Sequence, residues 1–138
     1  MKGIIYKIVD NTNNDVYYGA TYQKLSARKA GHRRDYNRYK NGTSFYTTAY
    51  DIFDNGNFNF EKIDSIENDD LSTLKSDLKK LERKYIEDNT CVNKVIPGRT
   101  KSEYQRYYYH LNKDRINKQR KERRLHKKIL SNNNIDNV

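Results

Sequence analysis

The first twenty residues have the hydrophobic and polar pattern of a β-hairpin. Residues 3–9 are rich in β-branched and aromatic side chains, residues 10–15 are turn formers, and residues 16–19 form a second apolar run that ends in glycine. Strand, polar turn and strand in this order are typical of a hairpin. We expect Tyr6 and Tyr17 to lie across from each other near one end of it.

A helix is predicted from about Gln23 to Lys40. Its small residues form one stripe that could lie close to a sheet: Ala27, Ala30 and Gly31. Steps of three or four residues give a second stripe: Leu25, Arg28, His32 and Tyr36. The spacing alone leaves two interpretations open, in which Arg28 and His32 are either solvated or directed at a phosphate.

The next segment predicts a second helix and a third strand. Residues 41–44 break the chain, and Ser44 can cap a helix. That helix would direct four apolar side chains inward: Phe45, Ala49, Ile52 and Phe53. Residues 55–57 end it, and alternation over residues 58–66 predicts a strand.

Residues 71–88 have the clearest helical period in the chain, with Asp69 or Asp70 available as a cap. The apolar seam consists of Leu71, Leu74, Leu78, Leu81, Tyr85 and Ile86. Glu82 lies inside this seam, and a carboxylate on an inward face is costly unless it is paired or binds a cation. Glu82 is therefore either half of a structural ion pair with an arginine or a metal ligand. Glu87 is the second candidate ligand, but it falls on the polar side.

These elements predict an α/β fold of the α+β type. We expect a small three-stranded antiparallel sheet flanked by helices, followed by a basic helical C-terminal extension. The only proline, in Pro97-Gly98, marks the boundary between residues 1–97 and 98–138. The first part has 16 basic and 14 acidic side chains, and the second has 12 and 4. Most of the excess positive charge is therefore in the tail.

The amino-acid composition indicates which class of partner the protein binds. The 138 residues carry a net charge of +10 and include 13 tyrosines. Basic charge mixed with aromatic rings suits a polyanion with stackable bases, so nucleic acid is the expected partner. One cysteine, Cys91, allows no intramolecular disulfide, and three scattered histidines form no zinc cluster. We expect no membrane span and no signal peptide. An intracellular protein follows, in the cytoplasm or, in a eukaryotic host, the nucleus.

The tail carries most of the candidate DNA contacts. Residues 101–130 have a helix-forming composition without a good apolar seam, which indicates either a helix ordered on a partner or a fluctuating basic arm. Residues 131–138 are expected to be disordered. The candidate DNA-binding residues are Lys24, Arg33 and Arg34 on the first helix and Lys101, Arg106, Lys113, Arg115, Lys118 and Arg120 in the tail.

Residues 3–95 resemble the GIY-YIG nucleases. Ile4-Ile5-Tyr6 and Tyr17-Tyr18-Gly19 are separated by ten residues, as are the two short motifs that name this family. Ile4 stands where the family usually has glycine, and Tyr18 where it usually has isoleucine. The later elements of the pattern match Arg28, His32, Glu82 and Asn93.

The resemblance implies a metal-dependent DNA endonuclease. Glu82 would hold a single Mg²⁺ or Mn²⁺, Arg28 would contact the scissile phosphate, and Asn93 would brace the site. Tyr6 would be the general base, with Tyr17 beside it, although the sequence does not decide between the two. A free tyrosine has a pKa near 10, so Arg28, His32 and the metal are expected to lower it. His32 would otherwise take the proton from Tyr6 or position it.

Two other classes of function remain open. A non-catalytic nucleic-acid-binding protein could retain the GIY-YIG fold, and an interaction module could do so without DNA. A compact domain with a basic tail resembles the homing, mobile-element, phage or viral members of the family. The expected oligomeric state is a monomer or a dimer induced by DNA.

Overall fold

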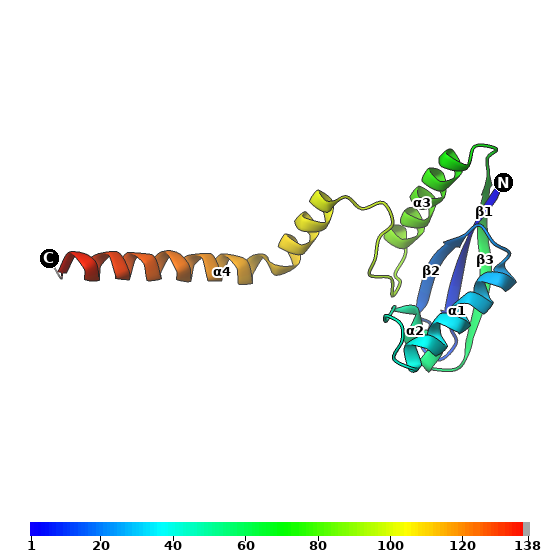
Figure 1. Ribbon diagram of the computed structural model, residues 1–138, viewed down its shortest axis with the longest axis horizontal. Helices are drawn as coiled ribbons and strands as arrows, with labels where there is room; N and C mark the ends of the chain where they lie inside the picture. The colour runs from blue at the N-terminus through cyan, green and yellow to red at the C-terminus, as the bar shows by residue number, and fades with distance from the viewer. Residues whose placement is uncertain (137–138) are drawn as a thin grey trace. The chain divides into compact units, whose positions relative to one another are not determined.

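The computed structural model describes residues 1–136, and side chains as far as residue 132 (Figure 1). Contacts divide the chain into a first unit, Met1–Gly98, and a second unit that begins at Arg99. The first unit contains all three strands and three of the helices, whereas the second contains a single helix. None of the described helices is long and apolar enough to cross a membrane.

The first unit is built on an antiparallel sheet of three strands, which confirms the fold class (Figure 1). Its strands are β1 (Lys2–Asp10), β2 (Val16–Thr21) and β3 (Phe58–Glu67). β1 is the central strand and pairs with both neighbours, so β2 and β3 are the edges. Ile4, Tyr6 and Ile8 lie on one face of β1 and are buried. Ile5 lies on the other face and is also buried, so this strand is covered on both faces.

The register of the hairpin corrects one expectation. Tyr6 pairs with Gly19, and Tyr17 pairs with Ile8, so the two tyrosines are diagonal neighbours on one face and not directly opposite. The glycine is required because the Tyr6 ring lies over it. A Cβ at position 19 would fall 2.4 Å from both the Tyr6 hydroxyl oxygen and the adjoining ring carbon.

Helix α1 (Leu25–Lys40) has the expected extent but not the expected inward face. Of the small-residue stripe, Gly31 is buried, but Ala27 and Ala30 are exposed, so the stripe as a whole does not lie on the sheet. The second stripe does, with His32 buried and Arg28 half-buried. The His32 ring lies 5.7 Å from that of Phe60 on β3. A polar stripe therefore faces the protein interior.

Helix α2 (Ala49–Asp54) starts later than predicted. Ser44 does not cap it, and Phe45 is 91% exposed, so both expectations are wrong. Residues 43–48 form a loop because Thr43 bonds back to Arg38 O through its N–H and hydroxyl group. The other inward residues are buried as expected: Ala49, Ile52 and Phe53.

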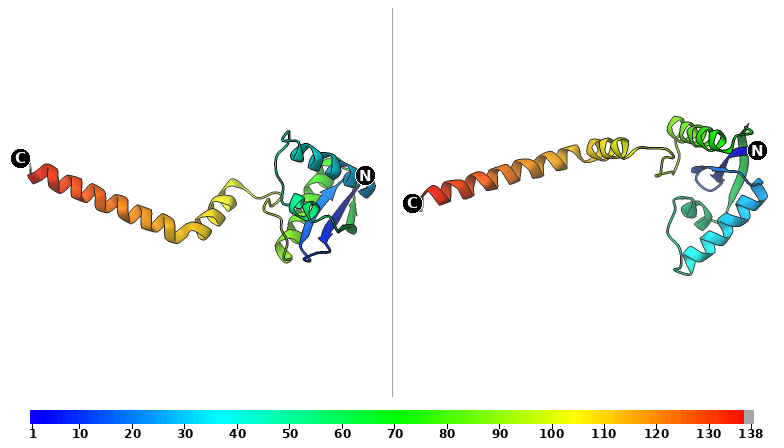
Figure 2. Two further views of the ribbon diagram at one scale, coloured as in Figure 1. Left: turned by 90° about the horizontal axis from the view of Figure 1, so that it is seen from below. Right: turned by 45° about the horizontal axis from the view of Figure 1, so that its top comes forward.

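Helix α3 (Leu71–Asp88) has the predicted bounds. Asp70 caps it by accepting bonds from the N–H groups of Ser72 and Thr73. Leu74 and Leu78 are buried, whereas Leu71 is half out in solvent. In the right-hand view of Figure 2, α3 lies on one side of the sheet, and α1 and α2 lie on the other.

The second unit is helix α4 (Lys101–Asp136). Thr100 and Glu103 cap its start in a reciprocal box, in which the Glu103 N–H donates to the Thr100 hydroxyl oxygen. The helix includes residues 131–136, the expected disorder of residues 131–138 stays a prediction, and residues 137–138 lie outside the described part. The basic and tyrosine side chains of α4 are exposed.

Candidate active site

Tyr6, Arg28 and His32 form a hydrogen-bonded group, called the Tyr6 cluster below. The Tyr6 hydroxyl oxygen lies 2.6 Å from His32 Nε2 and accepts a bond of 3.1 Å from Arg28 Nε. Tyr6 is fully buried and His32 nearly so. The central strand supplies the hydroxyl, and one turn of α1 supplies both partners, since residues 28 and 32 share a helical face.

Burial decides the protonation states in the Tyr6 cluster. It raises the pKa of Tyr6 above its ordinary value of 10.0, and the neighbouring Arg28 guanidinium opposes this shift. Burial also lowers the pKa of His32 to about 4, and Arg28 adds to that effect. His32 is therefore neutral near pH 7, and the expectation that it supplies positive charge is wrong. Arg28 alone does not produce the expected lowering of the Tyr6 pKa, because burial has the larger effect.

Tyr17 stands beside this cluster but is not bonded to it. Its ring lies 6.3 Å from that of His32, edge to face. Burial raises its pKa to about 12, and the nearby Tyr6 and Glu82 add to the rise. Tyr17 therefore stays protonated, so its hydroxyl is a donor. Tyr6 is protonated for the same reason, so the two tyrosines differ in their hydrogen bonds: in the described residues, His32 and Arg28 contact the Tyr6 hydroxyl and not that of Tyr17.

Glu82 is held in a half-buried position without a partner. Among the described residues, its carboxylate makes no hydrogen bond and no ion pair. Burial raises its pKa from 4.5 to about 6, and Arg28 is near enough to lower it in part. The ion-pair interpretation is therefore not seen in the described residues. Glu87, the second candidate, bonds to Arg83 Nε at 2.8 Å.

Glu82 lies in the wall of a cleft that it shares with Tyr17 but not with the residues of the Tyr6 cluster. The cleft has a volume of about 370 Å³, and its wall includes Tyr17, Glu82 and Asn93. The remaining lining residues come from two loops: Tyr46, Thr47, Thr48, Lys94, Val95 and Pro97. None of these six was a candidate site residue from the sequence, in which Pro97 marks only the boundary of the first part. Lys94 could have been found as the cation that directly follows Asn93, whereas the Tyr46–Thr48 loop carried no sequence signal of its own.

Asn93 fastens one wall of the cleft to the free edge of β2. Its side-chain carbonyl accepts a bond of 2.9 Å from the Tyr18 N–H, and its amide donates one of 2.8 Å to the Tyr18 carbonyl oxygen. The Val92 N–H adds a third bond, to Val16 O. Because the Asn93 side chain is occupied in this way, it positions the strand that bears Tyr17.

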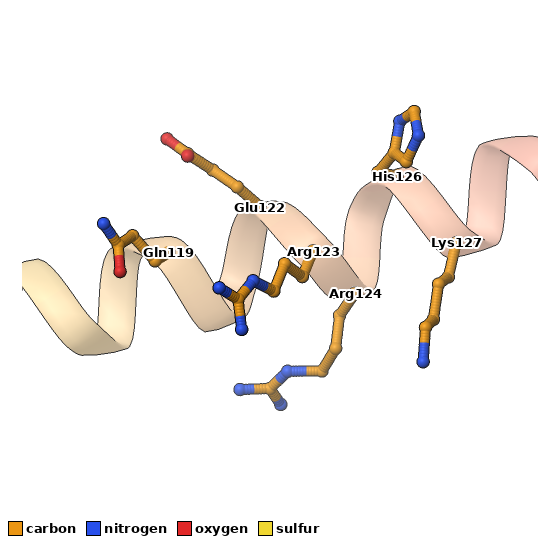
Figure 3. A pocket seen from close by; sticks show the side chains of 6 residues that line it. All are labelled: Gln119, Glu122, Arg123, Arg124, His126 and Lys127. Carbon is orange, nitrogen blue, oxygen red and sulfur yellow. The ribbon is translucent and has the colours of Figure 1, made fainter.

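The candidate DNA-binding residues are all exposed: Lys24, Arg33, Arg34, Lys101, Arg106, Lys113, Arg115, Lys118 and Arg120. On α4, Arg124 and Lys127 project from one side of the helix, and Glu122 and His126 project from the other (Figure 3). The hollow between these side chains is open and formed by one helix alone. It is therefore a charged surface and not a closed binding site.

The described residues contain no cluster of three or more histidine, cysteine or acidic side chains that could enclose a metal ion. A zinc centre of the usual kind is thus not found in the described chain. One carboxylate with free oxygens remains, at the wall of a solvent-filled cleft. This donor set fits a hard divalent cation that keeps most of its water ligands.

Comparison with known proteins gives one structural similarity. No protein-family model matches this chain, and no curated protein matches it either. A solved structure of a mutant of the catalytic domain of intron endonuclease I-TevI is similar over 64% of this chain and 84% of that one, with 20% identity and a TM-score of 0.46. Since the identity and the TM-score are low, the function proposed below rests on the residues of this chain.

Proposed function

We propose that this protein is a metal-dependent endonuclease that hydrolyses phosphodiester bonds in DNA. The observation that supports it most strongly is the Tyr6 hydroxyl, which accepts from Arg28 and touches a neutral His32 near an unpaired Glu82. Phosphodiester hydrolysis needs a proton acceptor for water and stabilisation of charge on the phosphate. The Tyr6 cluster and Glu82 offer these together.

Glu82 is the residue that would hold the metal, Mg²⁺ or alternatively Mn²⁺. Its oxygens have no hydrogen-bond partner in the described residues, and burial raises its pKa by more than the positive charge of Arg28 lowers it. A bound divalent cation would remove this penalty, and it would supply Lewis-acid stabilisation of the phosphate oxygens. The Asn93 amide is already used by Tyr18, and Glu82 is the only carboxylate among the described residues that line the cleft.

Tyr6 is the residue that would take a proton from the attacking water. Arg28 Nε donates to the Tyr6 oxygen, so the proton of Tyr6 is directed at His32 Nε2. That proton would pass to His32 Nε2 as the tyrosine oxygen takes one from water, although the low pKa of His32 opposes the transfer. The buried phenol therefore need not ionise beforehand, and its raised pKa is compatible with this role.

Arg28 would contact the scissile phosphate. Its Nε is bonded to Tyr6, which leaves the terminal N–H groups of a half-buried guanidinium for another acceptor. Arginine binds phosphate through such paired donors. Since one side chain would touch both the base and the phosphate, Arg28 would fix their mutual position.

The basic residues of α1 and α4 would bind the DNA backbone. Each phosphate neutralised on duplex DNA changes the slope of log K against log salt by about −0.9. We assign the first unit to the chemistry and the second to affinity. A homing or mobile-element role is proposed on the same basis, as an enzyme of small size with its own DNA-binding extension.

The test is incubation of supercoiled plasmid with the full chain and Mg²⁺, with EDTA as the control. Conversion to nicked or linear plasmid only with metal supports the proposal. Binding without conversion, at any metal concentration, supports the non-catalytic alternative. The absence of both would favour an interaction module.

A further inference from the structure

Phe45 is an aromatic side chain held out in solvent. It is 91% exposed, and no other large apolar side chain in the described part of the chain is as exposed. A single exposed apolar residue is ordinary. Its position gives this one significance, because Phe45 is joined directly to Tyr46, which lines the cleft with Glu82 and Tyr17.

The loop around Phe45 is fastened on both sides. Before it, the N–H and hydroxyl of Thr43 bond to the Arg38 carbonyl oxygen at 2.9 and 3.1 Å. After it, the Tyr46 hydroxyl donates to Asp51 at 2.5 Å, and the Tyr46 ring lies 5.8 Å from that of Tyr39. The exposure of Phe45 is therefore a feature of an anchored loop.

The rim of the cleft combines apolar and cationic groups. Val95, which also lines the cleft, is 82% exposed, and the adjacent Lys94 is a cation on the same wall. A phosphodiester bound in the cleft beside Glu82 would leave its nucleoside at the rim. A phenyl ring cannot contact a phosphate favourably, but it stacks on the face of any nucleobase.

We propose that Phe45 stacks on a base of the DNA next to the phosphate bound in the cleft, and that it makes the enzyme prefer an unpaired base at that place. This inference rests on the proposed function and names the substrate class more closely. Stacking on a paired base requires that base to leave its neighbours, which costs a few kcal/mol per step. A bulged or single-stranded base avoids this cost, so the preference follows.

The experiment measures binding of the full chain without Mg²⁺ to two oligonucleotide duplexes, one with a single bulged 2-aminopurine and one fully paired. The variants are Phe45→Ala, Phe45→Leu and Phe45→Trp. The matched control is Leu71→Ala, which removes another exposed apolar side chain at the first residue of α3. That position is 11 residues, or about 16 Å along the helix, from Glu82.

We expect Phe45→Ala and Phe45→Leu to bind the bulged duplex about 5- to 150-fold more weakly, the range measured for base–aromatic stacking. Phe45→Trp should retain the affinity, and Leu71→Ala should change it less than twofold. The 2-aminopurine fluorescence should be quenched by the unmodified chain and recover with Phe45→Ala. The paired duplex should respond less to every change at position 45.

Equal affinities of Phe45→Ala and the unmodified chain for the bulged duplex would overturn the inference. A melting temperature of Phe45→Ala several degrees lower without DNA would also overturn it, because the ring would then be covered by α4 or by a second copy. The readout needs no cleavage. Binding that depends on Phe45 in a chain that never cuts DNA would refute the proposed function and leave the stacking contact in place.

Discussion

The two halves of the candidate site differ in how far the protein completes them. In the Tyr6 cluster, the tyrosine hydroxyl has a protein partner on either side, at 2.6 and 3.1 Å. At the cleft, Glu82 has no bonded partner among the described residues, and burial raises its pKa to about 6. The first half is organised in advance by hydrogen bonds. In the second half, burial destabilises the ionised Glu82 carboxylate, and a bound cation would stabilise it.

The largest expected effect is at Glu82. Glu82→Gln should reduce Mg²⁺-dependent cleavage by about 10³-fold or more, since several kcal/mol of charge stabilisation depend on the metal ligand. Single-turnover rates on labelled DNA measure this. DNA affinity should change less than twofold. Glu87→Gln is the matched control. An equally large loss of cleavage in that variant would assign the metal to Glu87 instead.

The same substitution tests the pKa of Glu82 through stability. The pKa in the folded protein is raised above the ordinary 4.5, so the folded state binds this proton more tightly. The ionised carboxylate therefore destabilises the protein above about pH 6, and this penalty disappears below pH 4.5. Glu82→Gln should melt at a higher temperature than the unmodified chain at pH 8 and at a similar temperature at pH 4. A lower melting temperature at pH 8 would show that Glu82 has a stabilising partner.

Tyr6→Phe is expected to have the next largest effect. It removes only the hydroxyl, so kcat should fall about 10²- to 10⁴-fold, the usual contribution of general acid–base catalysis, with little change in affinity. Tyr17→Phe is the control and should lose much less, because Arg28 and His32 bond to the Tyr6 hydroxyl and, in the described residues, not to that of Tyr17. If Tyr17→Phe were the slower enzyme, the assignment of the base would be reversed.

The Tyr6 cluster also predicts the shape of the pH profile. With a pKa of about 4, His32 is neutral at every pH above 5.5 and should give no inflection near its ordinary 6.5. The acid limb should instead follow Glu82, near pH 6, and should move to lower pH as Mg²⁺ is increased, because metal and proton compete. Rates across pH 4.5–8 at two metal concentrations measure this. An acid limb whose pH does not change with the Mg²⁺ concentration would contradict the prediction.

Asn93→Ala should lower the stability of the protein because Asn93 holds the edge strand β2 in place. It removes both bonds to the Tyr18 backbone, and each net hydrogen bond is worth about 0.5–1.5 kcal/mol, so the free energy of unfolding should fall by about 1–3 kcal/mol. Urea unfolding measures the loss. Because Asn93 positions β2, cleavage should slow about tenfold or less. Unchanged stability would show that the strand edge does not need this amide.

The smallest effect is expected on α4. Replacing Lys118 and Arg120 by glutamine should flatten the slope of log K against log salt by about 2, since two phosphate contacts are lost. The matched control replaces two exposed lysines of α3, Lys75 and Lys79, with glutamine. DNA binding across a salt series separates them, and equal slopes for both pairs would show that α4 makes no particular backbone contact.

The strands and α3 could be predicted from the sequence because their signals are local. Alternation set the sheet, and Asp70 with the leucine period gave both ends of α3. The face of α1 could not be predicted in this way. Ala27 and Ala30 look suited to an interface, yet the buried side is the one with Arg28 and His32. Hydrophobic patterns fail where polar groups face inward to serve a site.

Ser44 and Phe45 show the opposite failure. Ser44 has the chemistry of a cap and Phe45 that of a core residue, but Thr43 and the ring of Tyr46 fix the loop against Arg38 and Tyr39 in the last turns of α1. These contacts with the preceding helix override the capping signal of Ser44. The candidate site residues could be named from the resemblance, whereas the bonds within the Tyr6 cluster and the neutral state of His32 required the packing of α1 on β3.

The most direct test of the difference between the two halves is a titration of the Glu82 side-chain carboxyl by carbon-13 NMR, with and without Mg²⁺. We expect a pKa of about 6 in the metal-free protein, and a saturable shift of this pKa to lower values as Mg²⁺ is added. A carboxyl resonance that does not respond to Mg²⁺, in a protein that still cuts DNA with Mg²⁺, would contradict the assignment of the metal to Glu82.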